Sequence, residues 1–178
     1  MKIYVARHGQ TLWNVQCKVC GRTDLPLTEE GLRQADALAQ EARKYPIDRI
    51  IASPMIRAQQ TAEAVSKACG LALQTDDRLI EQDYGSCEGL DRLDPRFLNC
   101  KRNFAVRYPD GESMLDLACR VYDFLDDVRV KYPGENVLLV CHGGVMRSIR
   151  TYFQDVTNEA YFGYSADNAK LECYEMEG

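Results

Sequence analysis

The hydrophobic positions of the chain alternate between short apolar runs and longer stretches in which apolar residues recur every three or four positions. Short runs are typical of buried strands, and the longer stretches are typical of helices that bury one face. The alternation of the two patterns predicts a layered α/β domain. The strand-like runs lie at residues 2–6, 49–52, 71–75, 136–141 and 171–174.

The helical stretches have recognisable start signals. Thr28 and Ser113 are residues of the kind that cap helix N-termini, and Ser53 is followed by Pro54, which suits the first helical position. A further helix is expected after Gly143. The helix that follows Thr28 is predicted to carry on its inner face Leu32, Ala35, Leu38, Ala39 and Ala42. The helix that follows Ser113 is predicted to carry on its inner face Met114, Leu117, Val121, Phe124 and Val128.

Residues 76–113 are the least regular part of the chain and are rich in Asp, Gly and Pro. A helix is expected within them after Pro95, carrying Phe97, Phe104 and Val106. Long excursions from a compact domain are often functional. We therefore interpret residues 76–113 as a cap-like segment over an active site.

The composition is that of an ordinary globular protein. The 178 residues suit one domain over 1–178, with 46% hydrophobic and 28% charged residues. Acidic residues outnumber basic ones, 27 to 22, which argues against nucleic acid as a partner. A few arginines in a cleft can still attract an anionic substrate. No signal peptide or apolar run of membrane-spanning length is visible, so we expect a cytoplasmic protein without membrane association.

The eight cysteines are expected to be free thiols, because no export signal accompanies them. Cys17 and Cys20 have a spacing that is found in metal and redox sites. A structural zinc site would need a second such pair, and the sequence has none. A metal or redox function for this pair is therefore the weaker alternative, and no cofactor is predicted.

The two histidines of the chain, His8 and His142, occupy matching positions, since each directly follows a predicted strand and precedes a glycine. Ligands of open α/β sheets bind beyond the carboxyl ends of the strands, so both imidazoles are expected in one crevice. Arg57 follows a third strand, and Arg7 precedes His8. Because guanidinium groups match phosphate oxygens, the pattern predicts a phosphate pocket.

His8 is the candidate nucleophile of this pocket, because a neutral imidazole can attack phosphorus and form a phosphohistidine. The leaving oxygen then needs a proton. Glu81, which follows the strand predicted at 71–75, is the preferred donor. Asp83 and Glu88 lie in the same segment and are alternative donors.

Six segments, taken in order, resemble the signature segments of the histidine phosphatase superfamily, also called the phosphoglycerate mutase-like family. One tripeptide such as Arg7-His8-Gly9 is weak evidence, whereas the ordered series is highly specific. Four residues that depart from frequent family residues are Gln10, Cys20, Gln82 and Cys87. The segments are residues 7–14 (RHGQTLWN), 21–28 (GRTDLPLT), 53–62 (SPMIRAQQTA), 79–89 (LIEQDYGSCEG), 111–113 (GES) and 140–144 (VCHGG).

The resemblance implies a fold and a role for each site residue. The fold would be a three-layer sandwich, a mostly parallel mixed sheet flanked by helices. His8 would be the phosphorylated nucleophile and Glu81 the proton donor, with no metal required. The residues that bind phosphate would be Arg7, Asn14, Gly21, Arg57, His142 and Gly143, of which Arg7, Arg57 and His142 would also act in catalysis.

The resemblance covers both phosphatases and mutases. Cofactor-dependent mutases carry a longer segment before the last histidine and an arginine where this chain has Gln82. We therefore expect a phosphatase that hydrolyses a small phosphorylated metabolite, with phosphoglycerate mutase-type transfer as the alternative. A non-catalytic domain that binds phosphorylated ligands is a weaker alternative. Such a domain would be expected to have lost His8, Arg7 or Glu81, and all three are present. The natural substrate, and the choice between monomer and homodimer, stay open at this point.

Overall fold

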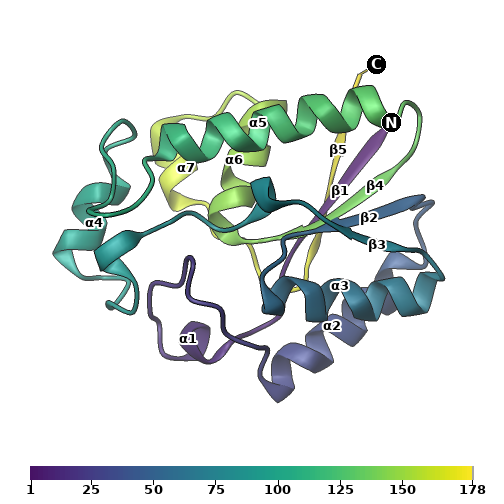
Figure 1. Ribbon diagram of the computed structural model, residues 1–178, viewed down its shortest axis with the longest axis horizontal. Coiled ribbons are helices and arrows are strands. Elements are labelled where there is room, and N and C mark those ends of the chain that lie inside the picture. Colours follow the sequence, from purple (N-terminus) through teal and green to yellow (C-terminus); the bar gives the residue numbers. More distant parts are fainter. Residues whose placement is uncertain (178) are drawn as a thin grey trace.

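A five-stranded sheet forms the centre of the computed structural model, which describes residues 1–177 (Figure 1). The strands lie in the order β3-β2-β4-β1-β5. Only β5 is antiparallel to its neighbour, β1. The sheet is therefore mixed and mostly parallel, as predicted. The strands are β1 (Lys2–Arg7), β2 (Arg49–Ala52), β3 (Leu73–Thr75), β4 (Val137–Cys141) and β5 (Leu171–Glu175).

Helices cover both faces of the sheet (Figure 1). Along β1, Tyr4 and Ala6 pack into the core beneath α2 and α3, while Ile3 and Val5 pack into the core beneath α5 and α6. Successive strand residues point to opposite faces, so one strand contributes to both cores. The predicted three-layer sandwich is confirmed. The four helices are α2 (Glu29–Ala42), α3 (Ile56–Cys69), α5 (Met114–Lys131) and α6 (Gly143–Phe153).

Two of the three predicted N-caps are confirmed. The side chains of Thr28 and Ser113 each accept a hydrogen bond from the backbone N–H three residues further along. The predicted cap at Ser53 is wrong, because α3 begins later, at Ile56. The backbone N–H of Ile56 instead donates to the carboxylate of Asp24 at 2.8 Å. The Ser53 hydroxyl is therefore not used as a helix cap.

The first turn of α2 also differs from the sequence pattern. Leu32, predicted on the inner face, is 47% exposed. Gly31 faces inward in its place, because a Cβ there would lie only 2.2 Å from the carbonyl oxygen of Gln10. The missing side chain lets the two backbones approach closely and turns Leu32 outward. The helix ends at Ala42, the last of the residues predicted on its inner face.

The cap-like segment, residues 76–113, lies at the end of the sheet where α4 is labelled in Figure 1. The expected helix after Pro95 is present, but it is short, and Phe104 and Val106 lie beyond its end. The segment holds η1 (Asp77–Leu79), η2 (Gly85–Cys87) and α4 (Pro95–Lys101). Two further short helices that the sequence pattern did not predict are α1 (Leu12–Val15) and α7 (Asn158–Gly163).

Aromatic rings give the cap-like segment a small core of its own. The ring centroid of Tyr84 lies 5.1 Å from that of Tyr108 and 5.5 Å from that of Phe97, and both pairs have edge-on geometry. Edge-on pairs are favourable beyond the area they bury. This cluster also includes Val19 from the loop that follows α1. It holds the cap-like segment against the loop and fixes the side chains that project from it.

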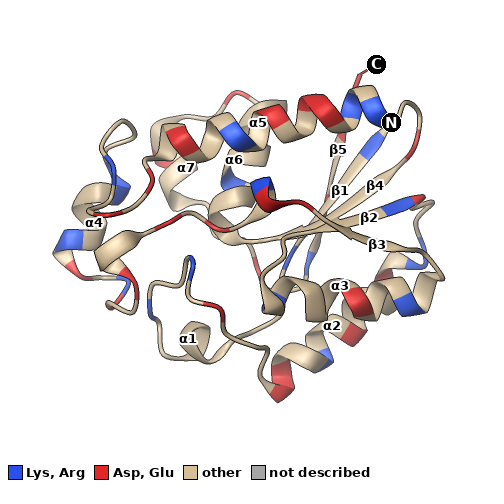
Figure 2. Cartoon of the chain, viewed as in Figure 1, with Lys and Arg blue, Asp and Glu red and all other residues tan. Residues whose placement is uncertain are grey.

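Charged side chains of both signs are spread over α2, α3 and α5 (Figure 2). Many form ion pairs, as Arg78 does with three carboxylates at 2.6 to 3.0 Å. Within residues 1–177, no helix is both long enough and apolar enough to cross a membrane.

Candidate active site

The register of β1 and β4 brings the two histidines together. Parallel pairing aligns Arg7 with Cys141, and the backbone N–H of His8 donates to the Cys141 carbonyl at 3.0 Å. His8 and His142 are the next residues of the two strands, and their ring centroids lie 5.1 Å apart. Both side chains are buried. The strand ends thus form the shared crevice that their sequence positions indicate.

The ring of His8 is held in one tautomer. Its Nδ1 lies 2.7 Å from the backbone carbonyl oxygen of Gly9. A carbonyl oxygen can only accept, so Nδ1 carries the proton and donates it, and Nε2 keeps its lone pair. Burial, followed by the charges of Arg7 and Arg57, holds the pKa of His8 well below its usual range. His8 is therefore a neutral imidazole of the kind that nucleophilic attack requires.

His142 has protein partners on both ring nitrogens. The Nε of Arg57 donates to its Nδ1 at 3.2 Å, and its Nε2 lies 2.8 Å from the Ser53 hydroxyl. A guanidinium cannot accept, so Nδ1 is unprotonated and Nε2–H donates to Ser53. Burial and the charge of Arg57 hold the pKa of His142 well below its usual range. The ring was predicted to face the phosphate, but it does not line the cavity.

Arg57 lies behind the histidines and is fully buried. Its Nη1 donates to the carbonyl of Thr23 at 2.9 Å, and its Nη2 donates to the carbonyl of Gly21 at 2.7 Å. These bonds tie α3 to the loop at residues 21–23. Neither Arg57 nor Gly21 lines the cavity, although both were predicted to bind phosphate. Their sequence positions place them near the site but do not reveal which surface they face.

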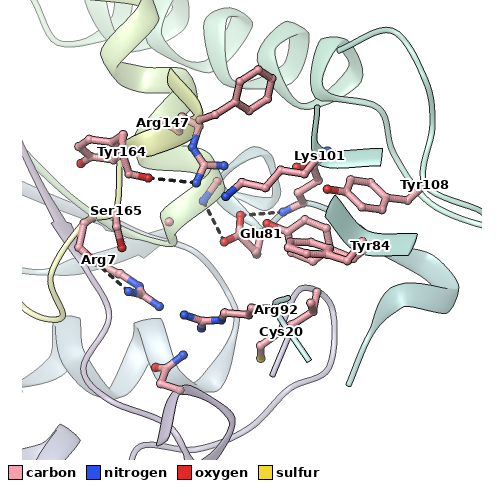
Figure 3. A pocket seen from close by; sticks show the side chains of 18 of the residues that line it. Arg7, Cys20, Glu81, Tyr84, Arg92, Lys101, Tyr108, Arg147, Tyr164 and Ser165 are labelled. Carbon is pink, nitrogen blue, oxygen red and sulfur yellow. Dashed lines mark hydrogen bonds between the residues drawn. The ribbon is translucent and has the colours of Figure 1, made fainter. Parts of the chain in front are cut away.

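Two guanidinium groups face the cavity beside His8. The Nη1 of Arg7 donates to the carbonyl of Ala166 at 2.9 Å, while its Nε is buried without a hydrogen-bond partner among the described residues. Arg92 projects toward Arg7 from the cap-like segment (Figure 3). Burial and the charge of Arg92 lower the pKa of Arg7. The two groups together present several N–H donors to a bound anion.

The carboxylate of Glu81 is fixed at the start of α6. Its Oε2 accepts from the backbone N–H of Gly144 at 3.0 Å, and its Oε1 accepts from that of Gln82 at 2.8 Å. The two alternative proton donors are occupied elsewhere. The Asp83 carboxylate binds a turn in its own segment, and the Glu88 carboxylate binds the loop at residues 22 and 23. Of the three carboxylates, only that of Glu81 lines the cavity.

Asn14 and Gly143 both line the cavity. The Oδ1 of Asn14 accepts from the Thr11 backbone at 3.0 Å, which leaves the amide NH₂ as its donor toward a ligand. Gly143 begins α6, where a backbone N–H has no acceptor within the helix. A Cβ at Gly143 would lie 3.9 Å from the Nε of Arg7 and 4.0 Å from the Oε2 of Glu81. Glycine therefore keeps the space between these two groups open.

Cys17 and Cys20, the alternative metal or redox pair, differ in their surroundings. Cys17 is exposed, whereas Cys20 lines the cavity, where its thiol donates to the Thr23 carbonyl at 3.7 Å. Burial raises the pKa of Cys20, which keeps its thiol protonated. Within residues 1–177, no group of three or more His, Cys, Asp or Glu side chains is arranged to hold a metal ion.

The cavity in front of His8 has a volume of about 260 Å³, which suits a small metabolite (Figure 3). Three cationic residues that the sequence analysis did not identify also line it. They are Arg92 and Lys101 from the cap-like segment and Arg147 from α6. Because the cap-like segment has no regular periodicity, its sequence gives no signal for the direction of these side chains. The other walls are formed by Val19, Cys20, Gln82, Tyr84, Phe97, Tyr108 and residues 162–166.

Comparison with known proteins identifies the family and several relatives that the chain resembles. Residues 3–178 match the histidine phosphatase superfamily (branch 1). A curated relative from Yersinia pestis (strain Pestoides F), named probable phosphoglycerate mutase GpmB, is 40% identical over 150 residues. That match covers 80% of this chain and 70% of the relative.

Two solved structures share the fold over nearly the whole chain. A mycobacterial glucosyl-3-phosphoglycerate phosphatase in complex with VO3 matches with a TM-score of 0.86 and 27% identity, covering 97% of this chain and 90% of that chain. YhfR from Bacillus stearothermophilus matches with a TM-score of 0.87 and 28% identity, covering 99% of this chain and 92% of that chain.

Proposed function

The chain belongs to the histidine phosphatase superfamily (branch 1), and from this premise we propose that it is a phosphatase that hydrolyses a small phosphate monoester through a phosphohistidine on Nε2 of His8. The proposal depends above all on the 2.7 Å contact between Nδ1 of His8 and the Gly9 carbonyl. This contact leaves Nε2 unprotonated on a ring that lines the cavity. The phosphatase among the structural neighbours supports the same reaction class.

The proposed reaction has two steps. In the first, the Nε2 lone pair of His8 forms a bond to phosphorus while the ester P–O bond breaks, and its electron pair leaves with the alcohol oxygen. The carboxyl group of Glu81 gives that oxygen its proton. In the second step, water attacks phosphorus, the N–P bond breaks, and the Glu81 carboxylate accepts a proton from the water. The products are the free alcohol and inorganic phosphate.

The oxygens of the transferring phosphoryl group need positive partners, because they carry its charge. Arg7, Arg92, the amide of Asn14 and the N–H of Gly143 surround the space in front of His8 and would supply them. Arg57 uses three of its five N–H groups on protein acceptors. A direct contact of Arg57 with the phosphate stays a prediction, because its guanidinium is buried and does not line the cavity.

The test of the proposal is turnover of p-nitrophenyl phosphate by the wild type and by His8→Ala. We expect the variant to lose at least roughly 10³-fold in kcat, because it has no nucleophile. Acid-labile phosphate should be trapped on His8 of the wild type by rapid quenching and located by mass spectrometry. Lys67→Met, an exposed change on α3, is the matched control. Near-normal turnover by a folded His8→Ala protein contradicts the mechanism.

The proposed mechanism uses only side chains of the protein and no metal ion. Activity should therefore be unchanged after dialysis against excess EDTA. Loss of activity that a divalent cation restores would overturn this part of the proposal while leaving the nucleophile unaffected.

A phosphoglycerate mutase activity is the second candidate, and the name of the 40% identical Yersinia relative favours it. A mutase returns the phosphoryl group from the histidine to a second hydroxyl, whereas a phosphatase transfers it to water. Incubation with 3-phosphoglycerate, followed by ³¹P NMR, separates the two. We expect that any turnover of this compound releases inorganic phosphate, and accumulation of the 2-phospho isomer would instead identify a mutase.

A further inference from the structure

The cations that line the cavity form two groups. Arg7 and Arg92 lie together beside His8, where both lower the pKa of the histidine. Lys101 and Arg147 lie together further along the cavity wall, as Figure 3 shows for their charged ends. Among residues 1–177, Glu81 is the only carboxylate that lines the same cavity. A phosphate on His8 would thus be matched by the first group and would leave the second group without an anion.

The second group lacks the ion pairs that are common elsewhere in this chain. Arg78 and Arg120, for example, contact carboxylates at 2.6 to 3.0 Å. Within residues 1–177, neither Lys101 nor Arg147 contacts a carboxylate at that range. Burial, followed by the charge of Arg147, lowers the pKa of Lys101 to about 8. Two like charges held together in a partly desolvated wall are unfavourable until an anion joins them.

Two buried donors at the same end of the cavity also have no partner. The Nε of Arg147 and the hydroxyl of Tyr108 make no hydrogen bond within the described residues. Tyr108 is 1% exposed and lines the cavity. Burial raises the pKa of its hydroxyl, and Tyr108 lies close enough to Arg147 for that charge to act on this pKa as well. Arg147 itself is held by a hydrogen bond to the Tyr164 carbonyl at 3.2 Å and by the ring of Tyr161. Buried donors without acceptors are rare in folded proteins, and a ligand can supply the acceptor.

We propose that Lys101, Arg147 and Tyr108 form a second anion subsite, so that the preferred substrate is a small phosphate monoester carrying a second anionic group, a carboxylate or a second phosphate. This inference rests on the proposed function, which places the reacting phosphate at His8. Phe97 lines the cavity near this subsite. Apolar walls exclude water and strengthen the attraction between the second anion and its cations.

The test uses three short alkylphosphonates of equal chain length, which cannot be hydrolysed. They end in a carboxylate, in the uncharged carboxamide, or in a second phosphonate. Isothermal titration calorimetry on the wild type should give a dissociation constant that is roughly tenfold lower for one or both of the doubly anionic compounds than for the carboxamide. A difference of this size corresponds to one charge-assisted hydrogen-bonded pair. The tighter of the two identifies the second group as a carboxylate or as a phosphate.

Variants of Lys101 show whether the preference comes from this subsite. Lys101→Met should reduce it to less than about threefold while leaving carboxamide binding unchanged, and Lys101→Arg should retain it. Lys67→Met, a lysine that is exposed on α3, should behave as the wild type. A wild type without the preference, or an undiminished preference in Lys101→Met, would overturn the subsite.

The corresponding phosphate esters separate this inference from the proposed function. Hydrolysis of all of them at similar kcat/KM refutes the subsite and leaves the phosphatase standing. Preferential binding of the doubly anionic phosphonates without hydrolysis of any ester refutes the phosphatase and leaves the subsite standing. A protein that binds none of the phosphonates contradicts both.

Discussion

The Nε of Arg57 donates a hydrogen bond to the Nδ1 of His142 across 3.2 Å, and this contact decides which nitrogen of the second histidine carries a proton. The proton lies on Nε2, which faces the hydroxyl of Ser53. Arg57 thereby orients His142 and, through its other nitrogens, holds the carbonyls of Gly21 and Thr23. A residue that sequence marks as a phosphate ligand therefore also has a structural role.

Arg57→Lys should lower the free energy of unfolding by about 2 to 3 kcal/mol, because one ammonium cannot reach the three acceptors that the guanidinium serves. Arg7→Lys is the matched comparison. Arg7 makes one hydrogen bond to the protein, so we expect its replacement to cost less than about 1 kcal/mol. Urea denaturation of both variants measures the difference. Equal losses would show that Arg57 has no special structural role.

Glu81→Gln should affect substrates according to their leaving group. An alkoxide needs a proton from Glu81, so kcat/KM on an alkyl phosphate should fall by roughly 10² to 10⁴-fold. A p-nitrophenolate leaves without that help, so the loss on the aryl ester should be far smaller. Glu88→Gln, which changes a carboxylate outside the cavity, provides the comparison. If kcat/KM falls equally for the alkyl and the aryl ester in Glu81→Gln, another group is the acid.

Gly144→Ala tests the position of the Glu81 carboxylate. A Cβ at residue 144 would lie 2.5 Å from Oε1 of Glu81, so the carboxylate must move. We expect kcat/KM on alkyl phosphates to fall at least tenfold, as a misplaced acid requires, while the unfolding free energy hardly changes. Gly163→Ala, whose Cβ would meet nothing within 4 Å, is the control. Unchanged alkyl phosphate hydrolysis in Gly144→Ala would show that this placement does not matter.

The two histidines should make stability fall as the solution becomes acidic. The pKa values of His8 and His142 are well below the usual 6.5 when folded, so below pH 6.5 the unfolded chain binds more protons than the folded chain. The contribution of the two rings to the free energy of unfolding is fully present above pH 6.5. As the pH falls below 6.5, this contribution decreases by at most about 1.4 kcal/mol per pH unit for each ring. Urea denaturation between pH 7 and 5 measures this slope.

His8→Gln should remove about half of that pH dependence, because one of the two titrating rings is gone. NMR titration of the imidazole protons provides an independent measurement. Neither ring should titrate between pH 6 and 8 in the folded protein. A ring with an ordinary midpoint near 6.5 would show that it is not held neutral by its surroundings.

Local patterns predicted much of this protein because strand ends are local features. The apolar runs of β1 and β4 and the polar residues that directly follow them indicated that His8 and His142 would meet. The pattern was wrong at Ser53 and Leu32, where contacts with distant residues override the local signal. Asp24 takes the capping role near Ser53, and the backbone of Gln10 sets the orientation of the turn that carries Leu32.

The sequence by itself determined the layered α/β class, the paired histidines and the candidate nucleophile, since periodicity and strand ends can be read from neighbouring residues. Only the tertiary structure decided which nitrogen of His8 is free and which carboxylate reaches the cavity. Glu81 is fixed by Gly144, 63 residues away, and Arg57 is hydrogen-bonded to Gly21, 36 residues away. Side-chain direction depends on such long-range partners, and no local pattern encodes them.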